Sequence, residues 1–156
     1  MKPEEDSIIA ALAGQPIVEY AFLEPEQIPF SERVRAICRK ECSRYGQSRF
    51  CPPAVGTLEE CRSRCLLYKR AFFFSTVWEE VNTEDMDSML YSGVLHERIA
   101  AKVAAYFQGT FGECLLLSRE PCMEGYGIQV INLSEACKLS TSQGPGTVTW
   151  FGMILY

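Results

Sequence analysis

Five of the eight cysteines fall between residues 38 and 65, in a segment that proline and glycine interrupt repeatedly. This segment restricts the chain more than any other feature, because proline and glycine break regular secondary structure. We therefore expect much of 25–56 to be irregular, with a turn of helix at 31–38. The clustered cysteines are Cys38, Cys42, Cys51, Cys61 and Cys65, and the dispersed ones are Cys114, Cys122 and Cys137.

The start of the sequence and its apolar runs indicate the cellular compartment of the protein. The chain starts Met-Lys-Pro-Glu-Glu-Asp, which lacks the basic start and apolar core of a secretory signal. Apolar runs such as 71–74 are too short to cross a membrane. We expect a cytoplasmic protein without membrane contact. In reducing surroundings a dense set of cysteines indicates metal binding or catalysis more often than disulfides.

Positive charge coincides with the cysteine-rich segment. The whole chain carries −5, yet residues 31–70 hold ten Lys or Arg and four Glu, a net charge of +6. Guanidinium groups beside thiols lower the thiol pKa and offset the charge of thiolates around a metal. The same groups could instead bind an anionic partner such as a nucleotide or nucleic acid.

Helical and strand patterns share the remaining sequence. Helices are expected at 7–13, 57–67, 83–107 and around 134–139, and strands at 17–23, 70–77, 113–118 and 147–156. This mixture predicts an α+β (or α/β) fold, with one domain over 1–156. We expect a sandwich in which a mixed or mostly antiparallel sheet carries helices on one face and the cysteine-bearing loop is attached. The stretch 99–107 is apolar nearly all round, which predicts a central buried helix.

The spacing Cys38-x3-Cys42-x8-Cys51-Pro-Pro predicts one metal centre. Thiolates are soft ligands for zinc or iron–sulfur clusters, and a tetrahedral set needs a fourth donor. Proline directly after a cysteine occurs in ferredoxin-type loops, which favours an iron–sulfur cluster, with zinc as the alternative. The candidates for the fourth ligand are Cys61, Cys65, Cys114 and Cys122, and we assign the site to Cys38, Cys42, Cys51 and Cys122.

Several cysteines also have a purely structural interpretation. Cys61 and Cys65 lie four residues apart on a helix, where core residues recur, and packing there is as good an explanation as ligation. Cys114 and Cys137 fit core positions better than ligand positions. His96, the only histidine, has no sequence partner for nucleophilic catalysis, and we expect it to be a partly buried polar residue.

These residues resemble a family of prokaryotic predicted metal-binding proteins of unknown function. The resemblance covers roughly 30–156 and implies metal binding through the first cysteine set. It is carried by Cys38-x3-Cys42-x2-Tyr45-Gly46-x4-Cys51-Pro52-Pro53, by Thr57-x2-Glu60-Cys61, by Pro121-x-Met123-Glu124 and by Trp150-Phe151-Gly152. Ser43-Arg44 departs from the residue and asparagine that usually precede Tyr-Gly. Longer members carry a second cysteine cluster, which this chain lacks, so we expect a shortened member with one centre.

We expect the protein to act as a redox accessory to a larger redox enzyme or as a redox sensor. Alternatively, the metal only stabilises the cysteine-bearing loop. Whether the chain is an enzyme stays open. A second interpretation is a basic module that binds an anionic partner while zinc shapes its loop. A third is catalysis by one activated thiol, Cys42 or Cys51. A fourth is a homo-oligomer that acts through its fold alone.

Overall fold

The computed structural model describes residues 2–42, 45–47, 49, 51–79, 81–119 and 121–156. In these ranges four strands form one sheet in the order β1-β2-β4-β3, and every neighbouring pair is antiparallel. The strands are β1 (Glu19–Leu23), β2 (Ala71–Trp78), β3 (Leu115–Leu117) and β4 (Val148–Leu155). The helices are α1 (Pro3–Leu12), α2 (Glu32–Glu41), α3 (Leu58–Leu66), α4 (Met86–Phe111) and α5 (Val130–Ala136), with a 3-10 turn η1 (Pro25–Gln27). The predicted α+β class is confirmed.

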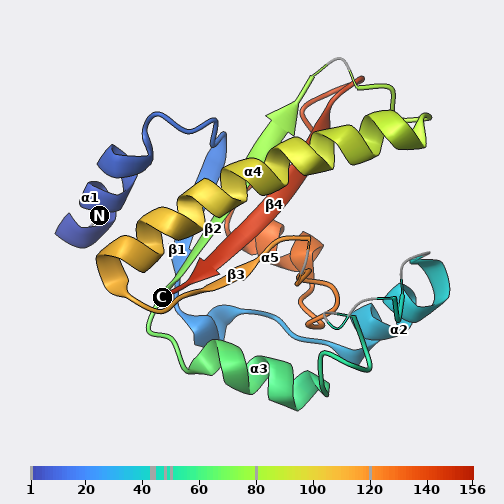
Figure 1. Ribbon diagram of the computed structural model, residues 1–156, viewed down its shortest axis with the longest axis horizontal. Coiled ribbons are helices and arrows are strands. Elements are labelled where there is room, and N and C mark those ends of the chain that lie inside the picture. The colour runs from blue at the N-terminus through green and yellow to red at the C-terminus, as the bar shows by residue number, and fades with distance from the viewer. Residues whose placement is uncertain (1, 43–44, 48, 50, 80, 120) are drawn as a thin grey trace.

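The central strand β2 is buried on both faces. Phe72 and Phe74 pack with α1 and α4, whereas Phe73 packs on the opposite side with α3, α5 and the segments around them. Alternate side chains of a strand point to opposite faces, so an apolar run needs cover on both. The prediction of helices on one face is therefore wrong: α4 crosses one face of the sheet, and α3 and α5 lie on the other (Figure 1).

The long helix α4 is a surface helix. It buries a stripe containing Ala100, Val103 and Phe107 and exposes Ala101, Lys102 and Ala105. The prediction of a central buried helix at 99–107 is wrong, because alanine is apolar in composition yet small enough to face solvent at little cost. Neither α4 nor any other helix in the described ranges combines the length and apolar character that a membrane crossing requires.

The helices around the cysteine-rich segment begin at the residues that the sequence indicates. The Thr57 hydroxyl accepts the Glu60 N–H at 3.1 Å and the Glu60 carboxylate accepts the Thr57 N–H at 3.2 Å, a capping box that starts α3. Ser31 caps α2 by accepting the Arg33 N–H. α2 then runs to Glu41, so it is longer than the single turn expected at 31–38.

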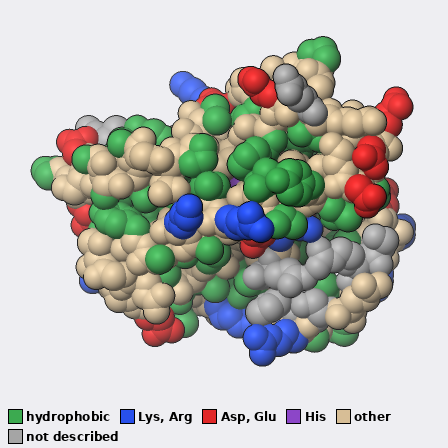
Figure 2. Space-filling model, turned by 45° about the horizontal axis from the view of Figure 1, so that its top comes forward, with side chains coloured by type: hydrophobic (Ala, Val, Ile, Leu, Met, Phe, Trp, Pro, Cys, Tyr) green, Lys and Arg blue, Asp and Glu red, His purple; other side chains and the backbone are tan. Residues whose placement is uncertain are grey.

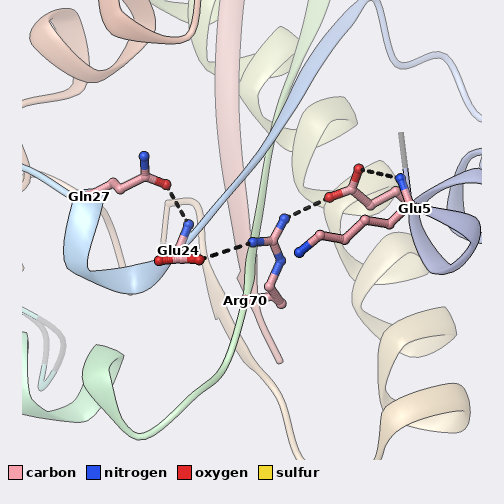
Figure 3. A network of polar contacts seen from close by, with 5 residues as sticks. Glu5, Glu24, Gln27 and Arg70 are labelled. Carbon is pink, nitrogen blue, oxygen red and sulfur yellow. Dashed lines mark hydrogen bonds and ion pairs between the residues drawn. The ribbon is translucent and has the colours of Figure 1, made fainter.

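Arg70 connects the start of β2 to two other elements (Figure 3). Its guanidinium donates to Glu5 of α1 at 2.6 Å and lies 3.9 Å from the Glu24 carboxylate, beside η1. The side chains of Arg70 and Glu5 are only 20% and 13% exposed, so the pair is shielded from solvent. Arg70, one of the basic residues in 31–70, therefore stabilises the fold.

A polar chain lies between α4 and the sheet. The Trp78 indole N–H donates to Thr76 Oγ1 at 2.9 Å. The Phe151 carbonyl can only accept a hydrogen bond, so the ring proton of His96 lies on Nε2, which donates to this carbonyl at 3.1 Å. His96 Nδ1 is therefore unprotonated and accepts a hydrogen bond from the Thr76 hydroxyl at 2.7 Å. His96 is fully buried, more deeply than expected, and burial lowers its pKa to about 4.

This buried histidine predicts a measurable acid sensitivity. Between pH 6.5 and 4 the unfolded chain protonates His96 and the folded chain does not, so the free energy of unfolding falls as the pH falls through this interval. We expect a loss of about 2 kcal/mol from this residue between pH 7 and pH 5. Denaturant unfolding of His96→Gln at both pH values should show a correspondingly smaller loss than the wild type. Equal losses in the two proteins would contradict this assignment.

Gly152 predicts a second stability effect. A Cβ on Gly152 would lie 2.6 Å from Cζ of Phe74, its partner across β2 and β4. We expect Gly152→Ala to lower the free energy of unfolding by about 1–3 kcal/mol through overpacking. The matched control is Gly109→Ala in α4, where nothing lies within 4 Å of the added atom, and helix propensity should raise stability by up to about 1 kcal/mol. Urea denaturation of both variants checks the opposite signs.

Candidate metal centre

The end of α2 places the first two candidate ligands one helical turn apart. Cys38 lies in the last turn of α2, and Cys42 is the capping residue whose N–H donates to the Cys38 carbonyl at 3.0 Å. Side chains four residues apart lie on the same helix face. The helix expected at 31–38 therefore extends past Cys38, and it positions both Cys38 and the start of the loop at Cys42.

Two arginines hold the loop that follows Cys51. The Val55 carbonyl accepts Arg64 Nη1 of α3 at 2.6 Å, and the Gly56 carbonyl accepts Arg35 Nη2 of α2 at 2.6 Å. Within the loop, the Val55 N–H donates to the Cys51 carbonyl at 3.0 Å. The loop therefore has its geometry set from both neighbouring helices, and two charges of the basic segment are used for this purpose.

Cys122 reaches the same region through a backbone connection. The Ser31 N–H donates to the Gly127 carbonyl at 2.7 Å, and the Gln129 N–H donates to the Pro29 carbonyl at 2.9 Å. These bonds tie the segment that follows Cys122 to the residues that lead into α2. The Gly125 N–H donates to Cys122 Sγ at 3.2 Å, an interaction that favours a thiolate over a thiol.

The four assigned cysteines line one cleft of about 910 Å³. Cys42 is exposed and the other three are half-buried. Described residues of α2 and of the loop after it line one side of the cleft, and residues of α4, β4, 118–119 and 122–132 line the rest. Further lining residues are Val34, Ile37, Glu41, Gln47, Leu90, Ser118, Arg119, Met123, Glu124, Ile128, Gln129, Val130, Ile131, Asn132, Thr149, Trp150 and Phe151.

The thiols influence one another electrostatically. Burial raises the pKa of Cys38, and the nearby Cys42 and Cys51 raise it further. Burial also raises the pKa of Cys122 to about 12, with smaller contributions from Cys38 and Cys51. Charged thiols this close repel one another unless a cation lies between them. Cys38, Cys51 and Cys122 thus form one interacting set, and Cys42 joins it through Cys38.

The set is not closed into a cage. Among the described residues, no three His, Cys, Asp or Glu side chains converge closely enough to hold an ion as they stand. The donor chemistry nevertheless fits a metal, since four thiols share one cleft and a backbone N–H already contacts one sulfur. Ser43 and Arg44, where the sequence departs from the family pattern, lie outside the described residues.

The other three candidates for the fourth ligand, and also Cys137, lie elsewhere. Cys61 and Cys65 are fully buried in the core between α3 and the sheet, as the packing interpretation predicts. Cys114 packs on the α4 side of the sheet, with its thiol 3.7 Å from the Ala104 carbonyl. Cys137 caps the end of α5 and packs against the α3 side of the core. None of these four lines the cleft.

A family model described as predicted metal-binding protein (DUF2284) matches residues 21–122. The chain belongs to this family. The match to DUF2284 contains Cys38, Cys42 and Cys51 and ends at Cys122, and it supports a metal cofactor in general. It starts earlier than the resemblance expected at residue 30, and the later segments at 123–130 and 150–152 lie beyond it. No curated protein and no solved structure matches the chain.

Sequence reasoning missed two contributors to the cleft of this DUF2284 member. Gly125 contributes only its backbone N–H, which no side-chain motif reveals, although the glycine directly follows Met123-Glu124 of the quoted pattern. Arg119 lies outside the basic 31–70 segment, and a single arginine in the acidic rest of the chain forms no motif that would indicate a binding site. The role of both residues becomes apparent only in the folded chain, where residues 118–119 and 121–132 lie near α2.

Burial predicts the order in which the thiols react. In the reduced, chelator-treated protein we expect iodoacetamide to modify the exposed Cys42 first. Cys61 and Cys65 should react about a hundredfold more slowly or only after unfolding, because both are inaccessible and burial raises the pKa of Cys65 to about 12. Mass spectrometry of timed digests measures each rate. Modification of Cys61 at the rate of Cys42 would contradict the arrangement of α3.

Proposed function

We propose that this protein binds one metal centre, an iron–sulfur cluster or zinc, through Cys38, Cys42, Cys51 and Cys122. The observation that carries the proposal is the shared cleft, in which four thiols from three separate chain segments face one volume. Four thiolates complete the tetrahedral set that either metal centre requires.

Cys122 is the best fourth donor on positional grounds. Cys61, Cys65 and Cys114 are held in core positions by packing, and none of them lines the cleft. The Gly125 N–H bond to Cys122 Sγ is the kind of outer contact that stabilises a metal-bound thiolate. The cysteine–proline step after Cys51 favours the iron–sulfur alternative.

A centre in this cleft would lie close to the surface, since Cys42 is exposed. An iron–sulfur cluster would supply one-electron redox chemistry there, and zinc would instead stabilise the loop. Exposed apolar side chains on three helices, Ile37, Leu90 and Ile131, also line the cleft. Surface access and an apolar rim suit a cytoplasmic redox accessory or sensor that docks on a larger redox enzyme.

The rival function, a basic module for an anionic partner, finds less support. Arg35 and Arg64 donate to loop carbonyls, and Arg70 pairs with Glu5. Arg62 pairs with Glu59 within α3. Arg35, Arg64 and Arg70 are thus engaged within the fold, which leaves fewer of the positive charges in 31–70 for a partner, and the metal centre is the leading proposal.

Metal analysis of matched variants tests the centre. Anaerobically purified wild type should contain iron and sulfide with broad absorption near ~400 nm, or about one zinc per chain without colour. Cys122→Ser should retain the metal about tenfold less well or worse, because it removes one ligand. Cys114→Ser is the control, since this half-buried thiol lies outside the cleft, and it should retain the wild-type metal content.

Two results would overturn the proposal. One is wild-type protein without stoichiometric metal after anaerobic purification and after reconstitution with iron and sulfide or with zinc. The other is full metal retention by Cys122→Ser and by Cys38→Ser alike. Retention by Cys122→Ser alone would refute Cys122 as the fourth ligand.

A further inference from the structure

The wall of the cleft that contains Cys122, across from Cys38 and Cys42 of α2, carries a positive charge without an ion pair among the described residues. Arg119 lines the cleft and is half-buried. Its backbone N–H donates to Glu97 Oε1 at 2.9 Å, but its guanidinium makes no hydrogen bond or ion pair with any described residue. A guanidinium with five donors in a partly enclosed cleft is a ready partner for a carboxylate or phosphate group.

The surroundings of Arg119 hold the guanidinium in place. It lies over the Trp150 ring at 5.6 Å from the ring centre, and the Trp150 indole N–H donates to Ser92 Oγ at 2.9 Å. Gly93 lets both side chains approach α4, since a Cβ there would lie 3.0 Å from Arg119 Nη1 and 3.1 Å from Trp150 Cζ2. The arginine is therefore positioned by its neighbours before any ligand arrives, which reduces the entropic cost of binding.

Two hydroxyl groups in the same wall are without partners. Ser118 is 7% exposed, and its Oγ has no hydrogen-bond partner among the described residues. The same holds for the buried Oγ1 of Thr149. Buried polar atoms are nearly always hydrogen-bonded, so unsatisfied ones at a cleft indicate a missing partner. Both residues line the cleft with Arg119.

We propose that this cleft binds an organic anion, with its carboxylate or phosphate group paired to Arg119 and its apolar body against Trp150 and Leu90. The cleft volume of about 910 Å³ lies within the range of small-molecule sites, and a few polar groups in a mostly apolar lining are typical of such sites.

The anion site adjoins the cysteines. Isolated backbone bridges pair Cys122 with Ser118 and with Arg119, so the two features share one short segment. The proposal deepens the proposed function by naming the class of molecule that would lie beside the metal centre. Its binding chemistry does not require the metal, so each proposal can fail without the other.

Charge-matched probes test the anion site. Calorimetric titration of the protein as purified uses 2-naphthoate, 2-naphthyl phosphate and the neutral 2-naphthalenemethanol. We expect at least one anionic probe to bind about tenfold or more tightly than the neutral probe, and the better of the two identifies the acidic group. Arg119→Met should remove this preference while the neutral probe binds as before. Metal content is measured in the same samples, so loss of the metal centre is recognised separately.

Two further variants separate a specific site from general charge. Arg98→Met removes an exposed cation of α4 and should leave every affinity unchanged. Gly93→Ala should weaken binding of the anionic probe several-fold by displacing the guanidinium, with no loss of helix content by circular dichroism. The proposal is overturned if the wild type shows no preference for either anion, if Arg119→Met keeps that preference, or if Arg98→Met loses it equally.

Discussion

The placement of β2 between β1 and β4 is the constraint on which the rest of the molecule depends. Its consecutive phenylalanines alternate across the sheet, so one strand supplies the centre of two separate cores. α1 and α4 close one core, while α3, α5 and the long connections close the other. β4 pairs with the whole strand and β1 with Ala71–Ser75, and the apolar surface of the strand leaves no face for solvent.

The cleft arises where the sheet ends early. β3 pairs with β4 only at Leu115–Leu117, opposite Met153–Leu155. The chain then leaves the sheet, and residues 121–132 lie beside the start of α2. Thr149, Trp150 and Phe151 pair with β2 on one side, and on their other side they border the cleft where β3 no longer continues. The short strand thus places Cys122 and Arg119 together at the edge of β4, with the end of α2 opposite them.

Two electrostatic features meet in the cleft. Thiols from both walls, Cys38 of α2 and Cys122 beside Arg119, disfavour each other's charged forms, a situation that a cation relieves. The wall with Arg119 carries a fixed positive charge beside hydroxyls without partners. The basic residues 35, 64 and 70 contribute little to either wall, because internal partners engage them.

Sequence reasoning succeeded where the determining forces are local. The capping box at Thr57, the apolar strand at 70–77 and the core positions of Cys61 and Cys65 follow from short-range hydrogen bonding and periodicity. It failed for 99–107, where it predicted a helix buried all round, and it placed the end of the helix at 31–38 too early, since α2 runs to Glu41. The first outcome depends on what packs against the segment, because the alanine-rich turns of α4 face solvent.

The sequence by itself determined the donor chemistry, because the cysteines and their spacing are read directly from it. It also determined the helices and strands whose caps and apolar patterns are local. Only the tertiary structure decided that Cys122 and Arg119 share a cleft with α2. That outcome rests on backbone bonds between 29–31 and 127–129 and on the early end of β3. Such contacts join residues far apart along the chain, and no local pattern encodes them.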